Sequence, residues 1–321
     1  MDLLRPKTLK HNAAAALAGS TYSPHRLTLI HIGVVTLVSL VLALISFWLS
    51  HEINQTSGLS GIGSRAILET AEMLLTTANL VLMPFWEAGF LWAALCMARR
   101  QKAQPQTLLA GFRRFLPLLG SKLLQGFLLG GFLTLGCYLG LAIFTMTPFS
   151  AGVRQALEPY LAADVLDMNA IYADAAVMHA MLPAFPFGIL GSALTALPMF
   201  YRLRFMDYIV LDLSAGPLRA FLATRPLMRD NRWKLVKLDL SFWWFYLLEG
   251  IIAAVCYGDL LLGLLGVALP MSAEVATLVF YACGMALQLG LYVWKRPYIA
   301  ATYAAFYDAI LPEEDEKNPL E

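Results

Sequence analysis

The sequence predicts an all-α integral membrane protein with six transmembrane helices, both termini cytoplasmic, and an outer amphipathic segment between helices three and four. Composition, apolar runs and the placement of basic residues lead to this prediction. The chain has 321 residues, of which 59% are hydrophobic and 14% charged, and its mean hydropathy is +0.64. Soluble domains average roughly 25% charged residues, so this chain lacks the charge that keeps a surface hydrated.

Repeated apolar runs are long enough to cross a hydrocarbon core of about 30 Å, which takes about 20 helical residues. The runs lie at about 27–49, 70–98, 115–147, 183–211, 235–263 and 275–295. The first is longer than the apolar part of a secretory signal, so we expect it to remain as a span. Three runs exceed the required length, which predicts tilting, kinking or extension beyond the bilayer. Kinks are expected at Pro84, Pro186 and Pro198, because proline removes a helix hydrogen bond.

The basic residues predict the orientation. Arg65 and Arg154 are the only basic residues in the segments between the first and second, third and fourth, and fifth and sixth predicted spans. The other 21 of the 23 Lys and Arg lie in the termini, in the two remaining loops or at the helix ends next to them. The positive-inside rule therefore places both termini in the cytoplasm. The predicted parts are a basic N-terminal arm at 1–26, a six-helix transmembrane domain at 27–295, and a C-terminal helix with an acidic tail at 296–321.

Residues 154–182 form the outer amphipathic stretch. Apolar residues recur there at helical spacing between acidic ones, for example Leu157 and Leu161 beside Glu158. Such a helix lies along the outer interface or caps the bundle. Packing on its own bundle is the first interpretation, and a partner-binding face is the alternative.

The predicted inner face carries clusters of basic residues. The segment 99–122 has six positive charges and no acidic residue. Membrane topology alone explains such clusters, whereas a sharper interpretation is attraction of anionic lipid headgroups. The candidates for that contact are Arg99, Arg100, Lys102, Arg113, Arg114, Arg229, Arg232, Lys234 and Lys237.

Two acidic residues fall inside predicted spans. Glu87 lies 12 residues before Arg99, and Glu249 lies 12 residues after Lys237. At 1.5 Å per residue, both are expected roughly 18 Å from the cytoplasmic border, near mid-membrane. They form either a proton or cation site or a pair of acids satisfied by neighbouring helices. Asn79, Gln125 and Gln288 are further polar candidates within spans.

Aromatic and glycine patterns predict how two helices are placed. Residues 242–246 are all aromatic and begin five residues after Lys237, which is typical of an anchor at the headgroup level. The third span contains Gly126-x-x-x-Gly130 and Gly136-x-x-x-Gly140, a spacing that permits close helix packing. We expect packing within the chain, with homodimerisation as the alternative.

No pattern for catalysis is found in the sequence. "HEINQ" at His51 lacks the second histidine of a zinc-protease helix, and nucleophile elbows, phosphate loops and dinucleotide fingerprints are missing. The four cysteines lie in apolar stretches that suit core packing. We therefore predict no enzyme activity, no cofactor, no metal site and no nucleic-acid partner.

Two C-terminal stretches carry a family resemblance. "LMRDNRWKLVKLDLSFWWFYLLEGI" begins at Leu227 and "WKRPYIAATYAAFYDAIL" begins at Trp294. Together with the opening "LKHNAAAALAGS", they resemble the bacterial integral membrane family catalogued as domain of unknown function 975. The matching positions are Met228, Leu238, Leu240, Ser241, Phe242, Pro297, Tyr298, Phe306 and Tyr307. Trp243-Trp244 departs from the family pattern Ser-Phe-x-Gly-Trp. The resemblance implies a multi-pass protein of the bacterial cytoplasmic membrane and brings no catalytic residues.

Three functions remain open at this point. The first is a non-enzymatic accessory or scaffold protein whose partners are membrane lipids, another membrane protein or a second copy of the chain. The second is a transporter of a small solute or proton that uses Glu87 and Glu249, and the third is an enzyme acting on lipid. The small number of spans and the absence of clear internal repeats favour the scaffold.

Overall fold

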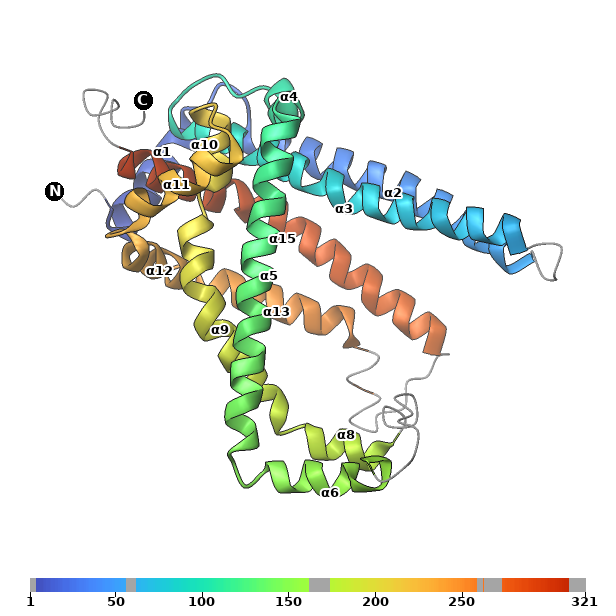
Figure 1. Cartoon of the computed structure of the whole chain (residues 1–321). Helices are drawn as coiled ribbons and strands as arrows, with labels where there is room; N and C mark the ends of the chain where they lie inside the picture. Colours follow the sequence, from blue (N-terminus) through green and yellow to red (C-terminus); the bar gives the residue numbers. More distant parts are fainter. Residues whose placement is uncertain (1–3, 56–61, 162–173, 259–261, 263–272, 312–321) are drawn as a thin grey trace. The chain divides into compact units, whose positions relative to one another are not determined.

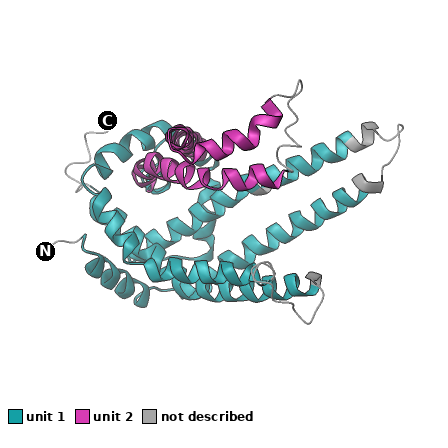
Figure 2. Ribbon diagram, turned by 90° about the horizontal axis from the view of Figure 1, so that it is seen from below, with its two compact units in different colours: residues 1–120, 205–321 teal, residues 121–204 magenta. Residues whose placement is uncertain are grey.

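The computed structural model describes residues 4–55, 62–161, 174–258, 262 and 273–311, and every regular element within them is a helix (Figure 1). By their internal contacts the residues form two compact units, coloured separately in Figure 2. Unit 1 comprises residues 1–120 and 205–321, and unit 2 comprises residues 121–204.

Five helical segments among the described residues are long and apolar enough to cross a membrane. They are Pro24–Glu52, Ala66–Ala98, Phe115–Thr145, Ala184–Asp212 and Val275–Ile310. A sixth span results if α12 (Arg232–Leu240) and α13 (Trp243–Cys256) are counted together. The predicted all-helical class is thus confirmed, with five to six apolar segments of spanning length where the sequence predicts six.

The predicted fifth span is not a straight helix, because α12 and α13 meet at an angle of 55°. In a continuous helix the Ser241 carbonyl would accept the Phe245 amide, but that amide donates to Phe242 instead (2.8 Å). The freed Ser241 oxygen accepts a hydrogen bond from Lys10 Nζ at 2.7 Å. A residue of α1 (Pro6–Ala18) thus satisfies the carbonyl that the break leaves free, and no proline marks the break in the sequence.

Unit 1 contains two long helix pairs. The helix α2 (Pro24–Gln55) packs along α3 (Ile62–Ala98), and α13 packs along α15 (Ala273–Ile310) (Figure 1). Their outer portions are covered by apolar side chains that face away from the protein, with Phe47 73%, Leu80 75% and Leu278 68% exposed. A surface this apolar is suited to lipid and unsuited to water.

The buried core of unit 1 lies at one end of these pairs. The second halves of α3 and α15 pack there with α1, and α3 also contacts α10 (Met206–Asp212), next to α11 (Pro217–Met228). Fully buried large side chains mark this core: Leu9, Phe90, Leu95, Phe205, Met206, Phe242, Phe306 and Tyr307. We call this helical assembly the inner layer, because the sequence predicts this end to be cytoplasmic.

The helix α15 runs without interruption past residue 295, where the sequence predicts the sixth span to end. It contains Pro297, which is buried, and continues to Ile310 within the inner layer. The predicted C-terminal helix is thus an extension of the last span. The acidic tail beyond residue 311 lies outside the described residues.

Unit 2 contains the main part of α5 (Phe115–Thr145) and all of α9 (Ala184–Leu203). Gly136 and Gly140 of α5 lie directly against the α9 backbone, where an added Cβ would overlap the carbonyl oxygens of Gly191 and Phe187. Around Gly126 and Gly130 there is open space. One of the two glycine motifs therefore packs within the chain, as expected, and the other does not.

The outer amphipathic stretch forms α6 (Ser150–Leu161) and α8 (Ala175–Met181), which pack on each other. Asp174 caps α8 by accepting from the Ala176 amide, and Tyr160 donates to the same carboxylate at 2.8 Å. This hydrogen bond lowers the pKa of Asp174 and raises that of Tyr160. The remainder of the predicted amphipathic helix, residues 162–173, lies outside the described part of the chain.

Candidate functional site

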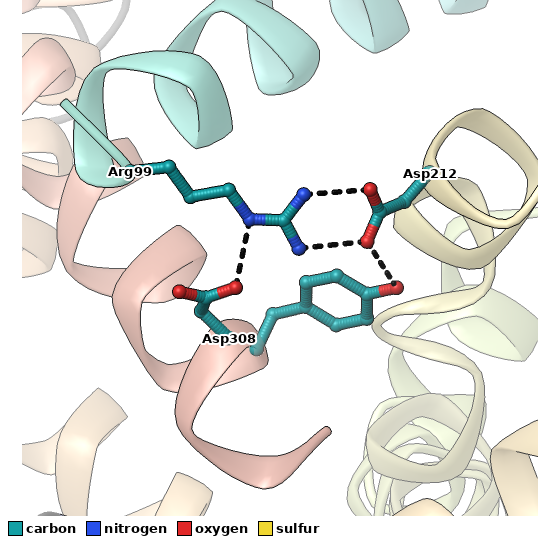
Figure 3. Close-up of polar contacts among 4 residues, drawn as sticks. Arg99, Asp212 and Asp308 are labelled. Carbon is teal, nitrogen blue, oxygen red and sulfur yellow. Dashed lines mark hydrogen bonds and ion pairs between the residues drawn. The ribbon is translucent and has the colours of Figure 1, made fainter. Parts of the chain in front are cut away.

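Arg99 forms the centre of a clamp in the inner layer (Figure 3). Its two terminal nitrogens donate to Asp212 at 2.7 and 2.8 Å, and its Nε donates to Asp308 at 2.8 Å. The Tyr307 hydroxyl donates to Asp212 at 3.3 Å. Bidentate pairing of this kind is among the strongest hydrogen-bonded ion pairs, and the bond to Asp212 raises the pKa of Arg99. The clamp joins the ends of α3, α10 and α15.

Glu87 belongs to a second polar group on the same two long helices. Arg296 of α15 forms an ion pair with the Glu87 carboxylate, and His31 Nε2 of α2 lies 3.6 Å from its other oxygen. The Arg296 guanidinium also lies over the rings of Phe90 and Tyr292, at 5.0 and 5.2 Å from their centres. The predicted intramembrane acid is thus matched by a fixed cation that sequence reasoning did not assign to it.

Glu249 approaches the same group from α13. It acts electrostatically on the Tyr292 hydroxyl, which also accepts a hydrogen bond from Gln288 at 3.3 Å. Tyr292 lies beneath the Arg296 guanidinium that pairs with Glu87. The structure therefore brings both predicted acids and Gln288 into one polar cluster, with Arg296 and Tyr292 between the acids.

The two ion pairs between α3 and α15 fix how these helices run. Glu87 pairs with Arg296 and Arg99 pairs with Asp308, so 12 residues separate the pairs on each helix. The segments 87–99 and 296–308 therefore lie parallel over roughly 18 Å. Glu87 and Arg296 must also share one depth in a membrane. The sequence predicts Glu87 near mid-membrane and the inner end of the sixth span at residue 295, next to Arg296. Because Glu87 and Arg296 are paired, these two predictions are incompatible.

A third polar group surrounds the break between α12 and α13. The Lys10 ammonium donates to the Ser241 carbonyl and lies 4.0 Å from the centre of the Phe242 ring. Burial lowers the pKa of Lys10. On the other side, the Tyr303 hydroxyl donates to Asp239 and lies 3.2 Å from the Tyr246 hydroxyl. The first two aromatics of the predicted anchor therefore differ, since Phe242 is fully buried and Trp243 is 62% exposed.

A groove lies where the 99–114 loop packs on α3. It consists of two adjoining hollows of about 640 and 290 Å³, which share Trp92, Ala110 and Arg113 in their walls. The larger is lined by apolar residues and Arg114, and the smaller by Lys102, Gln104, Gln106 and Thr107. Three of the predicted lipid-facing cations thus line one concave surface.

Close backbone packing holds the groove's inner wall. In the loop, η2 (Pro105–Leu109) and α4 (Ala110–Arg113) lie against α3, where Cβ atoms added at Gly89 and Gly111 would overlap the carbonyl oxygens of Leu108 and Phe85. The Phe85 and Phe115 rings stack at 4.5 Å between centres. Such contacts leave little freedom for the backbone that carries Arg113.

One protein family matches nearly the whole chain, including all the residues of these polar groups. The profile of a family described as "Protein of unknown function (DUF975)" matches residues 9–314. The chain belongs to this family. No curated protein and no solved structure shows significant similarity to the chain.

The residues that carry the DUF975 resemblance meet in the inner layer. Phe242 packs edge-on against Tyr298 at 6.1 Å between ring centres. Phe306 stacks on Phe205 at 5.6 Å, and Tyr307 stacks on Tyr208 at 5.1 Å. The two C-terminal motifs of this DUF975 protein thus contribute to the inner layer, whereas Leu240 of the first motif is 65% exposed.

The other predicted positions lie apart from these groups. Arg100, Arg229 and Lys237 are exposed, Arg232 and Lys234 are half-buried, and Lys234 donates to Asn231 at 3.2 Å. Gln125 bonds to Ser121 on its own helix, and the side chain of Asn79 lies outside the described residues. Within the described residues no cluster of His, Cys, Asp or Glu is arranged for a metal ion.

Sequence reasoning missed Asp212, Arg296 and Tyr292. Arg296 follows the predicted sixth span and Asp212 follows the fourth, so neither was a candidate for a charge within a span. The length of the predicted spans was an available signal. Three of them are longer than a membrane requires, so charged residues near their ends can pair with charges on neighbouring helices. Which residues pair depends on helix neighbours, which spacing alone does not give.

Proposed function

We propose that this DUF975 protein is a non-enzymatic accessory or scaffold protein of the bacterial cytoplasmic membrane that interacts with lipids or partner proteins at its inner face. The observation that carries this proposal is the Glu87–Arg296 ion pair. The pair neutralises Glu87, the acid that a transport path would need. It also joins α3 to α15 where the inner layer begins. The proposal includes no catalytic step.

The depth of that pair supports the proposal. His25 Nδ1, just before the first span, lies 2.9 Å from the Val293 carbonyl oxygen, and Lys295 lies over the rings of Trp294 and Trp244 at 3.6 and 5.7 Å. Tryptophan and lysine are typical of the headgroup level. We therefore place residues 293–295 at the inner border, and Glu87 with them.

Helix lengths agree with this depth. The apolar segments Ala66–Ala98 and Val275–Ile310 have 33 and 36 residues, more than the roughly 20 that a span needs. A span of about 20 residues crosses a core of about 30 Å. The remaining residues of both helices then extend beyond the bilayer, where α1 and the inner layer cover them.

Glu249 is shallower than its distance from Lys237 suggests. Because α12 and α13 meet at 55°, counting residues from Lys237 along a straight axis overstates the depth. Trp244 lies beside Lys295 at the border, and Glu249 follows five residues later, about 8 Å along the helix. Both acids are thus proposed to stabilise helix ends, with neither at mid-membrane.

Transport remains the second candidate, and one observation favours it. His31 is 1% exposed, its Nε2 faces Glu87, and its Nδ1 is buried with no hydrogen-bond partner among the described residues. A histidine next to a carboxylate is a common proton-relay unit. Against it, neither hollow of the groove on the 99–114 loop has any of these residues in its walls.

The proposal is tested by mild purification from native membranes, with co-purifying proteins, lipids and small molecules identified by mass spectrometry in one sample. An accessory protein is expected to retain a protein partner or lipid at fixed stoichiometry, in the wild type and in Glu87→Gln alike. A small solute that is retained by the wild type and lost in Glu87→Gln and Glu249→Gln would contradict the proposal.

A further inference from the structure

The groove on the 99–114 loop has the composition of a binding site for one end of an amphiphile. Most residues that line its smaller hollow carry polar side chains, among them Lys102, Gln104, Gln106 and Thr107. Its larger hollow is apolar, with Phe112, Phe115, Leu116 and Pro117. Arg113 and Trp92 belong to both hollows, at the junction of the polar and the apolar part.

Within the described residues, the positive charge of the groove is not neutralised by a carboxylate. Among the described residues, Lys102, Arg113 and Arg114 form no ion pair, whereas Arg99 in the same loop is held by two carboxylates. The sequence from residue 99 to residue 122 contains no acidic residue. Three positive charges around one concave surface attract an anion, and arginine is suited to bind phosphate oxygens through several donors at once.

The apolar side of the groove continues onto a membrane helix. Arg113 and Arg114 directly precede α5, whose first residues Phe115 and Leu116 are 38% and 76% exposed. A ligand with a phosphate at Arg113 can therefore place an apolar chain against Phe115 and Leu116 at the start of α5. A soluble phosphate compound would leave these apolar residues uncovered.

We propose that this groove binds an anionic phospholipid, with its headgroup phosphate at Arg113, the remaining headgroup toward Lys102 and Gln104, and its acyl chains along Phe115 and Leu116. The site selects a lipid with net negative charge, because a zwitterionic headgroup would place its own cation among three others. This deepens the proposed function, and it rests on that function for the position of the loop at the inner membrane face.

The test uses the full chain, purified in mild detergent and offered equal amounts of phosphatidylglycerol and phosphatidylethanolamine with identical acyl chains. Bound lipids are counted by native mass spectrometry. The groove variant is Lys102→Gln/Arg113→Gln/Arg114→Gln. Its matched control is Lys7→Gln/Arg219→Gln/Arg225→Gln, which removes the same charge from exposed positions on α1 and α11 whose residues do not line the groove.

The wild type and the control are expected to prefer phosphatidylglycerol by at least about fivefold, the effect of one basic residue near an anionic lipid. The groove variant is expected to lose that preference while its melting temperature stays within a few degrees of wild type. Equal losses in both triple variants would overturn the proposal in favour of general charge attraction. If the groove variant fails to fold, Arg113→Gln alone decides, and an unchanged preference there overturns the site.

Two further arms separate the possible sources of failure. Free glycerol phosphate at millimolar concentration is expected not to displace the bound lipid, and complete displacement would overturn the lipid assignment in favour of a soluble ligand. The mild purification from native membranes is repeated with the groove variant. Loss of anionic lipid with retention of a protein partner supports the groove and the accessory function together. No lipid preference in the wild type, with a partner still retained, overturns the groove while the accessory function stands.

Discussion

At the scale of single residues, the charged side chains of this protein act mainly on one another. Arg99 donates three hydrogen bonds to carboxylates on two other helices, and Arg296 pairs with Glu87 while it covers two aromatic rings. Removing one partner of such a pair leaves the other charge unmatched, and that penalty exceeds the net contribution of the pair. These residues should therefore affect stability more than their small number suggests.

The clamp predicts unequal effects at its two carboxylates. Asp212 is 11% exposed and accepts two bonds from Arg99 and one from Tyr307, whereas Asp308 is 43% exposed and accepts one. We expect Asp212→Asn to lower the free energy of unfolding by roughly 2–3 kcal/mol. Asp308→Asn should lower it by about 1 kcal/mol or less. Thermal melting of the two purified variants against wild type measures the difference, and equal shifts would count against the clamp.

At the scale of helices, local sequence and distant contacts decide different features. The apolar runs predict which segments form long helices, because helix length and hydropathy are local properties. The break after Leu240 could not be predicted in this way, since the partner of the Ser241 carbonyl is Lys10, 231 positions away. Pro84, Pro198 and Pro297, by contrast, each lie inside a single helix.

The two glycine motifs of α5 give a matched test of helix packing in unit 2. An added side chain at Gly136 overlaps Gly191 and Thr195, whereas one at Gly130 enters open space. We expect Gly136→Leu to lower the melting temperature by several degrees, as overpacking costs about 1–3 kcal/mol. Gly130→Leu should behave as wild type. A larger loss in Gly130→Leu would instead indicate that this face of α5 is covered by a partner or a second copy.

At the scale of the whole molecule, composition alone predicts the fold class, and the polar cluster does not follow from it. The 59% hydrophobic content and the long apolar runs suffice for a helical chain with five to six spans. The cluster of Glu87, Arg296, Tyr292 and Glu249 depends on which helices are neighbours. The sequence nominated both acids by a depth counted from Arg99 and Lys237, whereas the proposed function places both acids nearer the inner border.

Orientation is a further prediction for the whole chain. With the four native cysteines replaced by alanine, Lys102→Cys should react with a membrane-impermeant maleimide only in inside-out vesicles. Gly152→Cys on α6 should react only in right-side-out vesicles, since both positions are exposed but lie on opposite sides by the positive-inside rule. The reverse pattern would invert the topology and remove the basis for an inner lipid groove.

The most direct test of the account is proton and cation flux in proteoliposomes, with the melting temperature measured on the same preparations. Wild type, Glu87→Gln and Arg296→Gln are compared under an imposed pH gradient and membrane potential, with an ionophore as positive control. A structural pair predicts no flux above protein-free vesicles and a lower melting temperature in both variants. Flux in the wild type that is lost in Glu87→Gln, with the melting temperature unchanged, would contradict the account and identify the polar cluster as a transport site.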